Sequence, residues 1–222
     1  MNDALDNQIA YWDRVAEEKN FTLPFNKATF RRLVALDGRV LDFGCGYGRT
    51  CEILDRLGYK KTTGLDIAEK MIDRGLKTNP HLDLRVLNPG QWPGHPESFD
   101  AVVLFAVLTC IPTSTGQKVL VAQIDQIMRP GGILYISDFW LQEDDRNLER
   151  YHKFEQQYDT YGVFELSEGV VLRHHDRAWV RSLLSRFDTV AQEDIDVTTM
   201  NGHRSQGFQY FGRKVQGDKD GR

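Results

Sequence analysis

The chain of 222 residues suits one α/β domain with small additions, and its 41% apolar and 27% charged residues are an ordinary globular balance. The net charge of −4 disfavours a nucleic-acid partner, because proteins that grip a phosphate backbone usually carry a basic face. Three cysteines without a C-x-x-C pair indicate neither a disulfide framework nor a zinc site. Residues 1–10 lack the apolar block of a signal peptide and no apolar run reaches membrane-spanning length, so we expect a cytoplasmic protein without a membrane partner.

Residues 1–36 are expected to form a helical cap that precedes the main domain. Apolar residues recur every three to four positions over residues 5–19, which predicts an amphipathic helix. A second helix is predicted over residues 27–35, and Asp37-Gly38 ends it.

From residue 37 to residue 215, short apolar runs alternate with amphipathic stretches. This alternation is typical of a parallel sheet with right-handed crossovers. The expected strands cover residues 40–43, 61–65, 82–87, 99–104 and 133–136, and the expected helices cover residues 50–57, 68–77 and 115–128, with a turn at 130–132. The strand at 99–104 is nearly all apolar, as expected of a central strand that is covered on both faces.

Residues 140–175 interrupt this alternation and are interpreted as an inserted substrate lid. The expected elements of the last third are a helix over 144–158, a hairpin around Glu168-Gly169, a helix capped by Asp176, and two strands over 189–198 and 207–213 that are joined through Asn201-Gly202. The predicted fold is therefore a doubly wound, mostly parallel seven-stranded sheet with an antiparallel C-terminal hairpin. Residues 216–222 are polar and glycine-rich, and we expect them to be a disordered tail.

The most informative segment is Asp42-Phe43-Gly44-Cys45-Gly46-Tyr47-Gly48, which follows the first strand. Ligands of doubly wound sheets bind at the carboxyl ends of strands, and glycines let the backbone turn sharply and approach a ligand closely. Asp66 ends the second strand roughly 20 residues later, where nucleotide-binding sheets place an acid for ribose hydroxyls. A dinucleotide loop needs a third glycine where this loop has Arg49, and Asp42 suits a cofactor with an ammonium and a sulfonium better than a pyrophosphate.

This segment resembles the D-x-G-C-G-x-G signature of class I S-adenosylmethionine-dependent methyltransferases. Residues 64–71, 98–108 and 128–134 are similar to the family's ribose-binding segment, its fourth strand and its turn into the fifth strand. The resemblance covers roughly residues 38–138, and it implies that S-adenosylmethionine is the cofactor.

The predicted cofactor-binding residues are Tyr11, Asp42, Gly44, Cys45, Gly46, Asp66, Ile67, Met71, Asn88, Pro89 and Phe105. The resemblance implies that Asp66 holds the ribose diol and that Ile67 and Met71 pack near the adenine. Asn88, followed by Pro89, stands where the family usually has an acid for the adenine amino group. A plain N-cap role for Asp66 and a packing role for Tyr11 are the alternatives.

A methyl group would be transferred to O, N or S of a small molecule. The family's motif for holding base amines does not follow strand 99–104, and no Pro-Cys nucleophile for carbon-5 of cytosine is present. The alternatives are a methyltransferase that acts on tRNA or protein and a catalytically silent S-adenosylmethionine-binding module. No metal is implied.

A general base is needed only when the acceptor must lose a proton. The candidate bases are His174, Asp138, His152 and Tyr158. His175 is expected to be exposed beside the cap of the next helix. The aromatic residues of the insertion would either pack on the domain or cover the substrate.

Overall fold

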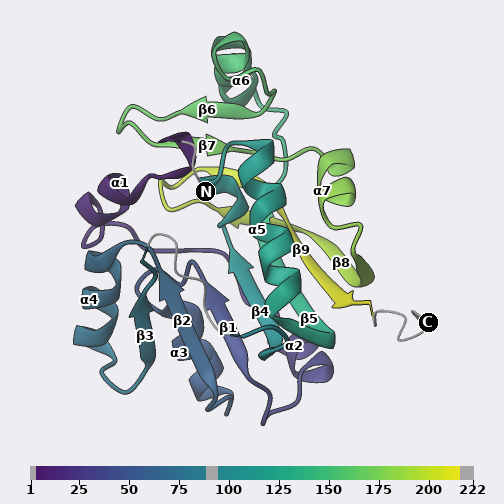
Figure 1. Ribbon diagram of the computed structural model, residues 1–222. Coiled ribbons are helices and arrows are strands. Elements are labelled where there is room, and N and C mark those ends of the chain that lie inside the picture. Colours follow the sequence, from purple (N-terminus) through teal and green to yellow (C-terminus); the bar gives the residue numbers. More distant parts are fainter. Residues whose placement is uncertain (1–3, 89–94, 216–222) are drawn as a thin grey trace.

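The computed structural model describes residues 4–88 and 95–215, so the predicted tail at 216–222 lies outside the described residues. The main sheet consists of β1 (Val40–Phe43), β2 (Thr62–Asp66), β3 (Asp83–Val86), β4 (Phe99–Phe105), β5 (Met128–Phe139), β8 (Phe187–Thr198) and β9 (Arg204–Lys214). Their spatial order is β3-β2-β1-β4-β5-β9-β8; the first five run parallel, and β9 is antiparallel to both of its neighbours (Figure 1). The predicted doubly wound sheet with an antiparallel C-terminal hairpin is confirmed.

The helices follow the strands in the expected alternation. They are α1 (Ile9–Arg14), α2 (Lys27–Leu33), α3 (Arg49–Arg56), α4 (Glu69–Thr78), α5 (Ser114–Ile127), α6 (Asp145–Tyr158) and α7 (Arg177–Leu183), with two short 3-10 turns, η1 (Ala4–Asp6) and η2 (Leu108–Cys110). The predicted lid contains α6 and a separate hairpin of β6 (Val163–Glu165) and β7 (Val171–Arg173).

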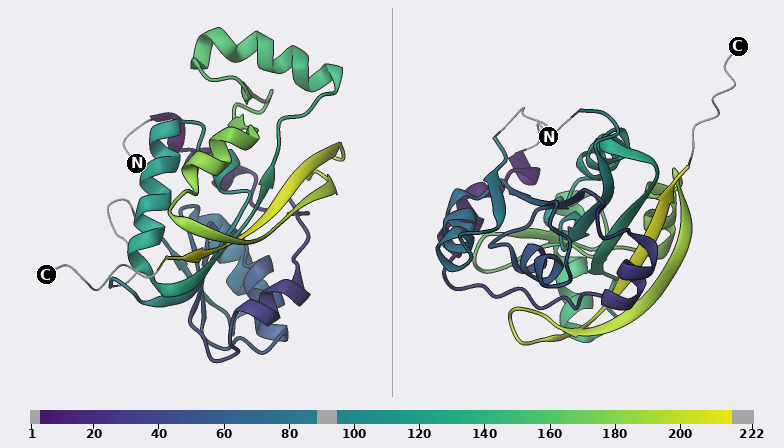
Figure 2. Two further views of the ribbon diagram at one scale, coloured as in Figure 1. Left: turned by 90° about the vertical axis from the view of Figure 1, so that its right-hand side faces the viewer. Right: turned by 90° about the horizontal axis from the view of Figure 1, so that it is seen from below.

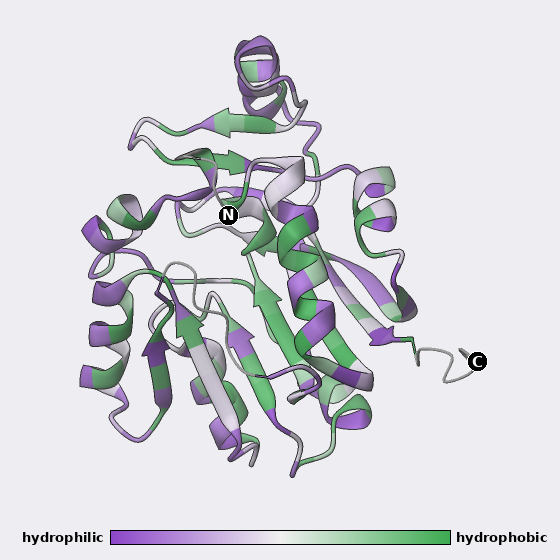
Figure 3. Cartoon of the chain, viewed as in Figure 1, coloured by the Kyte–Doolittle hydropathy of each residue, from purple (hydrophilic) through white to green (hydrophobic). Residues whose placement is uncertain are grey.

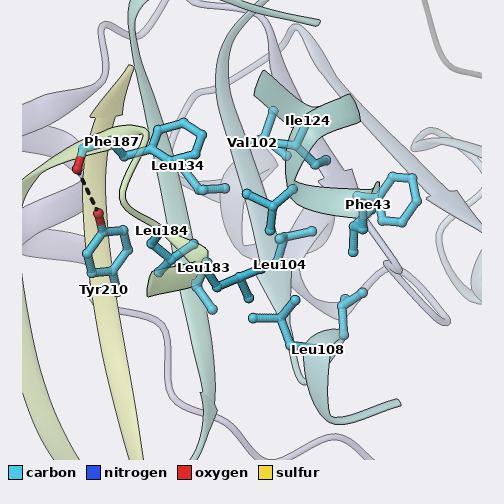
Figure 4. Close-up of a cluster of buried hydrophobic side chains, with 14 of the residues drawn as sticks. Phe43, Val102, Leu104, Leu108, Ile124, Leu134, Leu183, Leu184, Phe187 and Tyr210 are labelled. Atoms are coloured by element: carbon cyan, nitrogen blue, oxygen red, sulfur yellow. Dashed lines mark hydrogen bonds between the residues drawn. The ribbon is translucent and has the colours of Figure 1, made fainter. Parts of the chain in front are cut away.

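Helices α5 and α7 cover one face of the sheet. Successive strand residues point to opposite faces, so Val102 and Leu104 of β4 meet Ile124 of α5 and Leu183 of α7 in one buried cluster (Figure 4). Each fully buried aliphatic side chain of this kind contributes about 1.5–3 kcal/mol relative to an exposed one. Figure 3 shows that β4 is apolar along most of its length, which fits a strand buried on both faces.

Helices α2 and α3 cover the opposite face. Ala101 and Val103, the alternate residues of β4, pack there with Phe30 of α2 and Leu54 of α3. Tyr135 of β5 stacks on Phe211 of β9 in the same layer, with ring centroids 3.9 Å apart. The sheet is therefore closed on both faces, and a ligand site has to lie at one of its ends.

The sheet order reverses between β1 and β4, and this reversal determines which end carries the site. The chain leaves β1 toward β2 and leaves β4 toward β5, so the two connections diverge and leave a crevice at the carboxyl ends of the strands. The lid lies beyond that end, with α6 outermost (Figures 1 and 2).

Two sequence-based expectations are wrong in extent. The helix predicted over residues 5–19 is limited to η1 and α1, because the side chains of Asp6 and Gln8 bond to Thr113 and Val171 and hold the chain out of helical geometry between them. The turn predicted at residues 130–132 lies inside β5: Phe99 pairs with Met128 and Ala101 with Ile133, so the intervening residues form a bulge.

The cap of α7 gives a direct test of local stability. The Asp176 carboxylate accepts a hydrogen bond from the Trp179 N–H at 2.8 Å, which satisfies a donor that the first turn leaves free. Asp176→Ala should lower the free energy of unfolding by about 1 kcal/mol in urea titrations. Asp73→Ala, at an exposed site within α4, should change it by less than about 0.5 kcal/mol. Equal effects of the two substitutions would contradict the capping role.

Candidate functional site

The loop after β1 has the geometry that its glycines allow. Gly44, Gly46 and Gly48 have φ of +72°, +54° and +78°, in the left-handed region that favours glycine. A Cβ on Gly44 would lie 2.6 Å from Val107, and one on Gly46 would collide with the ring of Phe21. The loop is thus held between η2 and the N-terminal segment, and its backbone forms part of a cavity wall.

Two carboxylates flank this loop. Asp66 accepts hydrogen bonds from the Gly46 N–H at 2.7 Å and from the Ala68 N–H at 2.9 Å, so it ties the loop to the start of α4. The N-cap residue of α4 is Ala68, so Asp66 supports the helix from two residues earlier. Asp42 is buried, and Cys51 Sγ donates to its Oδ2 at 3.3 Å. Burial raises the pKa of Asp42 to about 7, because an isolated carboxylate is poorly solvated there.

A cavity of about 240 Å³ opens beside the loop, roughly twenty times the space that one water needs. Four parts of the chain line it: the N-terminal segment, the ends of β1, β2 and β4, the lid, and the loop between β8 and β9. The lining is mostly apolar, as is usual for small-molecule sites.

Most of the predicted cofactor-binding residues line this cavity. Those that do are Tyr11, Asp42, Gly44, Cys45, Gly46, Asp66, Ile67, Met71 and Phe105. Asn88 is exposed and does not line the cavity, whereas its neighbour Leu87 does. Pro89 lies outside the described residues. The structure thus brings together the loop and the ends of β1, β2 and β4, but it leaves out the residue expected to bind the adenine amino group.

Of the predicted bases, His174 lines the cavity. The other three do not. Asp138 is fully buried and accepts hydrogen bonds from the N–H groups of Thr109 and Phe139. His152 and Tyr158 of α6 lie near Glu155 and Glu165 respectively, and His152 is largely exposed.

His175 is buried, contrary to the expectation that it is exposed. Its Nε2 lies 3.5 Å from Asp138 Oδ1. Its backbone N–H donates to Phe139 O, and this link to the end of β5 draws the residue into the core.

His174 itself is held by a phenol. Tyr151 Oη and His174 Nδ1 are 2.5 Å apart, so one ring nitrogen is engaged. Burial, followed by the nearby charge of Arg150, lowers the pKa of His174 well below its usual value. The imidazole is therefore neutral near pH 7; it can accept a proton in this form, but the lowered pKa makes it a weaker base than a free imidazole.

Several lining residues could not be recognised from the sequence. Arg49 lines the cavity, donates to Leu23 O at 2.7 Å, and has a buried Nε without a hydrogen-bond partner. Arg146 and Arg150 lie one helical turn apart on α6, and their i, i+4 spacing was the one available sign that they share a face. Residues 199–205 reach the cavity through the C-terminal hairpin, and no local pattern indicates such a long-range contact.

Of the lid's aromatic residues, Phe164 lines the cavity. Tyr151 lies behind it, next to His174. Phe164 is thus placed where it could cover a substrate, whereas Tyr151 packs within the lid. Within the described part of the chain, no group of three or more His, Cys, Asp and Glu side chains is placed to hold a metal ion, and no helix is long and apolar enough to cross a membrane.

The N-terminal segment is fastened to the lid across the cavity. Glu168, in the β6–β7 turn, accepts from Tyr11 Oη at 2.8 Å and from Lys19 Nζ at 3.1 Å. Lys19 also donates to Asn201 at 2.9 Å, and the Gln8 side chain pairs with both backbone groups of Val171. These contacts join the N-terminal segment, the lid and the β8–β9 loop, which all contribute residues to the cavity lining.

Part of the chain matches a known family. Residues 41–136, which are less than half of the chain, match a family model described as a methyltransferase domain, from β1 through most of β5. This match, the sheet order and the glycine loop agree with the resemblance to class I S-adenosylmethionine-dependent methyltransferases.

Individual proteins show more particular likenesses to this chain. A ubiquinone biosynthesis O-methyltransferase of Xanthomonas oryzae pv. oryzae (strain PXO99A) is 32% identical over 111 residues, which are 48% of this chain and 45% of that protein. The match thus spans less than half of that relative's length.

Two solved structures share the fold. A SAM-dependent methyltransferase from Methanosarcina mazei has a TM-score of 0.76 and 21% identity, over 85% of this chain and 97% of that chain. The 1,6-didemethyltoxoflavin-N1-methyltransferase of Burkholderia thailandensis, with 1,6-didemethyltoxoflavin and S-adenosylhomocysteine bound, has a TM-score of 0.60 and 16% identity, over 86% and 80%.

The burial of Asp42 predicts a pH dependence of stability. The folded-state pKa of about 7 exceeds the usual value of 3.8. Between about pH 4 and pH 7, the native protein therefore still holds a proton on Asp42 that the unfolded chain has already lost. The contribution of this group to the free energy of unfolding therefore falls as pH rises through that range. Urea titrations at pH 5 and pH 7 should show a larger loss for the wild type than for Asp42→Asn. Asp73→Asn, at an exposed site, should behave like the wild type; parallel behaviour of all three proteins would contradict the prediction.

The fastening of the N-terminal segment can be tested by amide exchange. Glu168→Ala should weaken the closed arrangement by about 1 kcal/mol, which corresponds to roughly five-fold faster exchange in α1. Glu143→Ala, at an exposed site before α6, is the matched control and should leave that exchange unchanged. Unchanged exchange in Glu168→Ala would show that α1 is held independently of the lid.

Proposed function

We propose that this protein binds S-adenosylmethionine at the glycine loop and transfers its methyl group to an O, N or S atom of a small molecule. The observation that carries the proposal is the shared cavity. The glycine loop, Asp42 and Asp66 line one part of it, and lid residues line another, so a cofactor and an acceptor can share one enclosed space.

The residues present fit the cofactor. When bound, S-adenosylmethionine supplies a methyl group on a positively charged sulfur, which is a good leaving group. Asp42 is a buried carboxylate whose ionised form a ligand ammonium would favour, and the Arg49 guanidinium can meet a ligand carboxylate. Asp66 would hold the ribose hydroxyls, and Met71 offers an apolar surface for the adenine.

The chain's own part in the reaction is positioning and the exclusion of water. In-line displacement needs the acceptor atom about 3–3.5 Å from the methyl carbon, and a closed apolar chamber restricts the acceptor's motion. The fastened lid keeps water away from both reacting groups. For a hydroxyl or ammonium acceptor, the neutral imidazole of His174 would accept the released proton.

Three observations favour a small acceptor over tRNA or protein. The chain carries a net charge of −4. Contacts of Glu168 with Tyr11 and Lys19 tie the lid to the N-terminal segment, and this arrangement favours a small acceptor over a bulky one. The relative from Xanthomonas bears the name of a ubiquinone biosynthesis enzyme, and the Burkholderia neighbour holds a small molecule.

Calorimetric titration with S-adenosylmethionine, S-adenosylhomocysteine and NAD tests the cofactor assignment. We expect micromolar affinity for the first two and none for NAD. Asp66→Ala should weaken binding at least about ten-fold, because it removes both the proposed ribose contact and the support of Gly46. Asp55→Ala, at an exposed ion pair on α3, should bind like the wild type. Binding of NAD alone would refute the proposal.

Turnover tests the role of His174. With an acceptor found by screening phenols, amines and thiols, His174→Gln should lower kcat by about 10²–10⁴-fold if the acceptor must lose a proton. His81→Gln, at an exposed histidine, should leave kcat unchanged. An unchanged kcat in His174→Gln would remove the proposed base. A protein that binds the cofactor but methylates nothing would instead be the catalytically silent module.

A further inference from the structure

Among the described residues, two arginines that line the cavity form no ion pair: Arg49, beside the glycine loop, and Arg150, on the lid. Arg150 of α6 lines the cavity, its guanidinium lies 3.5 Å from the centroid of the Phe164 ring, and its buried Nε has no hydrogen-bond partner. The ion pairs found within residues 4–88 and 95–215 do not include Arg150, although they include Arg146 one turn earlier. An arginine stays protonated at physiological pH, so Arg150 carries a positive charge without an ion pair of its own; the nearby Asp144 carboxylate, which is paired with Arg146, attracts it without contact.

The groups that face Arg150 do not neutralise it. Phe164 of β6 presents a ring face, Tyr151 a phenol whose pKa burial raises to about 12, and His174 a neutral imidazole. The three carboxylates that line the cavity are engaged elsewhere: Asp66 with the glycine loop, Asp6 with Thr113, and Asp42 with Cys51. A half-buried, unpaired charge costs free energy, and a ligand that brings an anion recovers it.

The cavity that Arg150 lines is mostly apolar. Phe139, Leu166, Leu172 and Met200 line it together with Phe164, and Arg146, one turn earlier on α6, lines it too. A ligand that suits this chamber has an apolar body and one anionic group. A carboxylate matches the planar fork of a guanidinium with two parallel hydrogen bonds, and one cation balances its single charge.

We propose that Arg150 makes the acceptor site selective for small molecules that carry a carboxylate on an apolar or aromatic body. The proposal rests on the function proposed above. It adds the chemical class of the acceptor and a specificity-determining residue. The cofactor's own carboxylate would meet Arg49, so the two arginines serve different ligands.

Matched acid and amide pairs test this preference. Protein saturated with S-adenosylhomocysteine would be titrated with benzoate and benzamide, cinnamate and cinnamamide, and 1-naphthoate and 1-naphthamide. In at least one pair, the wild type should bind the acid about ten-fold or more tightly than the amide. Arg150→Gln should reduce that ratio to about one, whereas Arg150→Lys should retain part of it. Lys153→Gln, which removes an exposed cation from the same helix, should keep the wild-type ratio.

The affinity for S-adenosylhomocysteine, measured in the same proteins, separates the two proposals. If it does not bind, the proposed function fails. If it binds the wild type and Arg150→Gln alike while acids bind no better than amides, or no acid binds at millimolar concentration, the acceptor inference is overturned and the proposed function stands. A preference for acids that survives in Arg150→Gln would also overturn it, since another group would then read the charge.

Discussion

The Asp66 carboxylate holds the site together, because its two oxygens bind backbone N–H groups from two different loops. Gly46 follows β1 and Ala68 precedes α4, so one side chain fixes the distance between the ends of neighbouring strands. The left-handed glycines make this close approach possible. Every other part of the cavity is arranged around this fixed edge: the N-terminal segment covers it, and the lid closes the opposite side.

The cavity divides its charges by function. Carboxylates and Arg49 lie near the glycine loop, Arg146 and the unpaired Arg150 lie at the lid, and most of the remaining lining is apolar. Electrostatic interactions are stronger in such a poorly solvated space than in water. A cationic cofactor and an anionic acceptor would therefore each find their complement at a different end, which also sets their relative orientation.

The sequence predicted the sheet and one half of the site well because both depend on local patterns. Apolar runs such as residues 99–104 indicate buried strands, and the glycine spacing with Asp42 and Asp66 indicates which strand ends bind the ligand. The other half depends on long-range contacts. The bonds of Gln8 to Val171 and of Lys19 to Asn201 join segments more than 160 residues apart, and no periodicity reports them.

The same dependence on long-range contacts explains why three of the four candidate bases do not line the cavity. His152, Tyr158 and Arg150 share a helix, and which of its faces turns toward the cavity depends on how the lid docks. The prediction favoured residue types with familiar proton chemistry, whereas docking placed Arg150 in the cavity and left His152 exposed. Asp138 lies near the end of a strand, which made it a candidate for the pocket. Its carboxylate instead accepts hydrogen bonds from two backbone N–H groups and lies beside His175.

A crystal structure of the protein grown with S-adenosylhomocysteine tests the central claim most directly. The account predicts that the ligand lies in this cavity, with its ribose at Asp66, its amino group toward Asp42 and its sulfur directed toward the chamber lined by Phe105 and His174. A ligand bound elsewhere, or one that leaves the glycine loop uncontacted, would contradict the account.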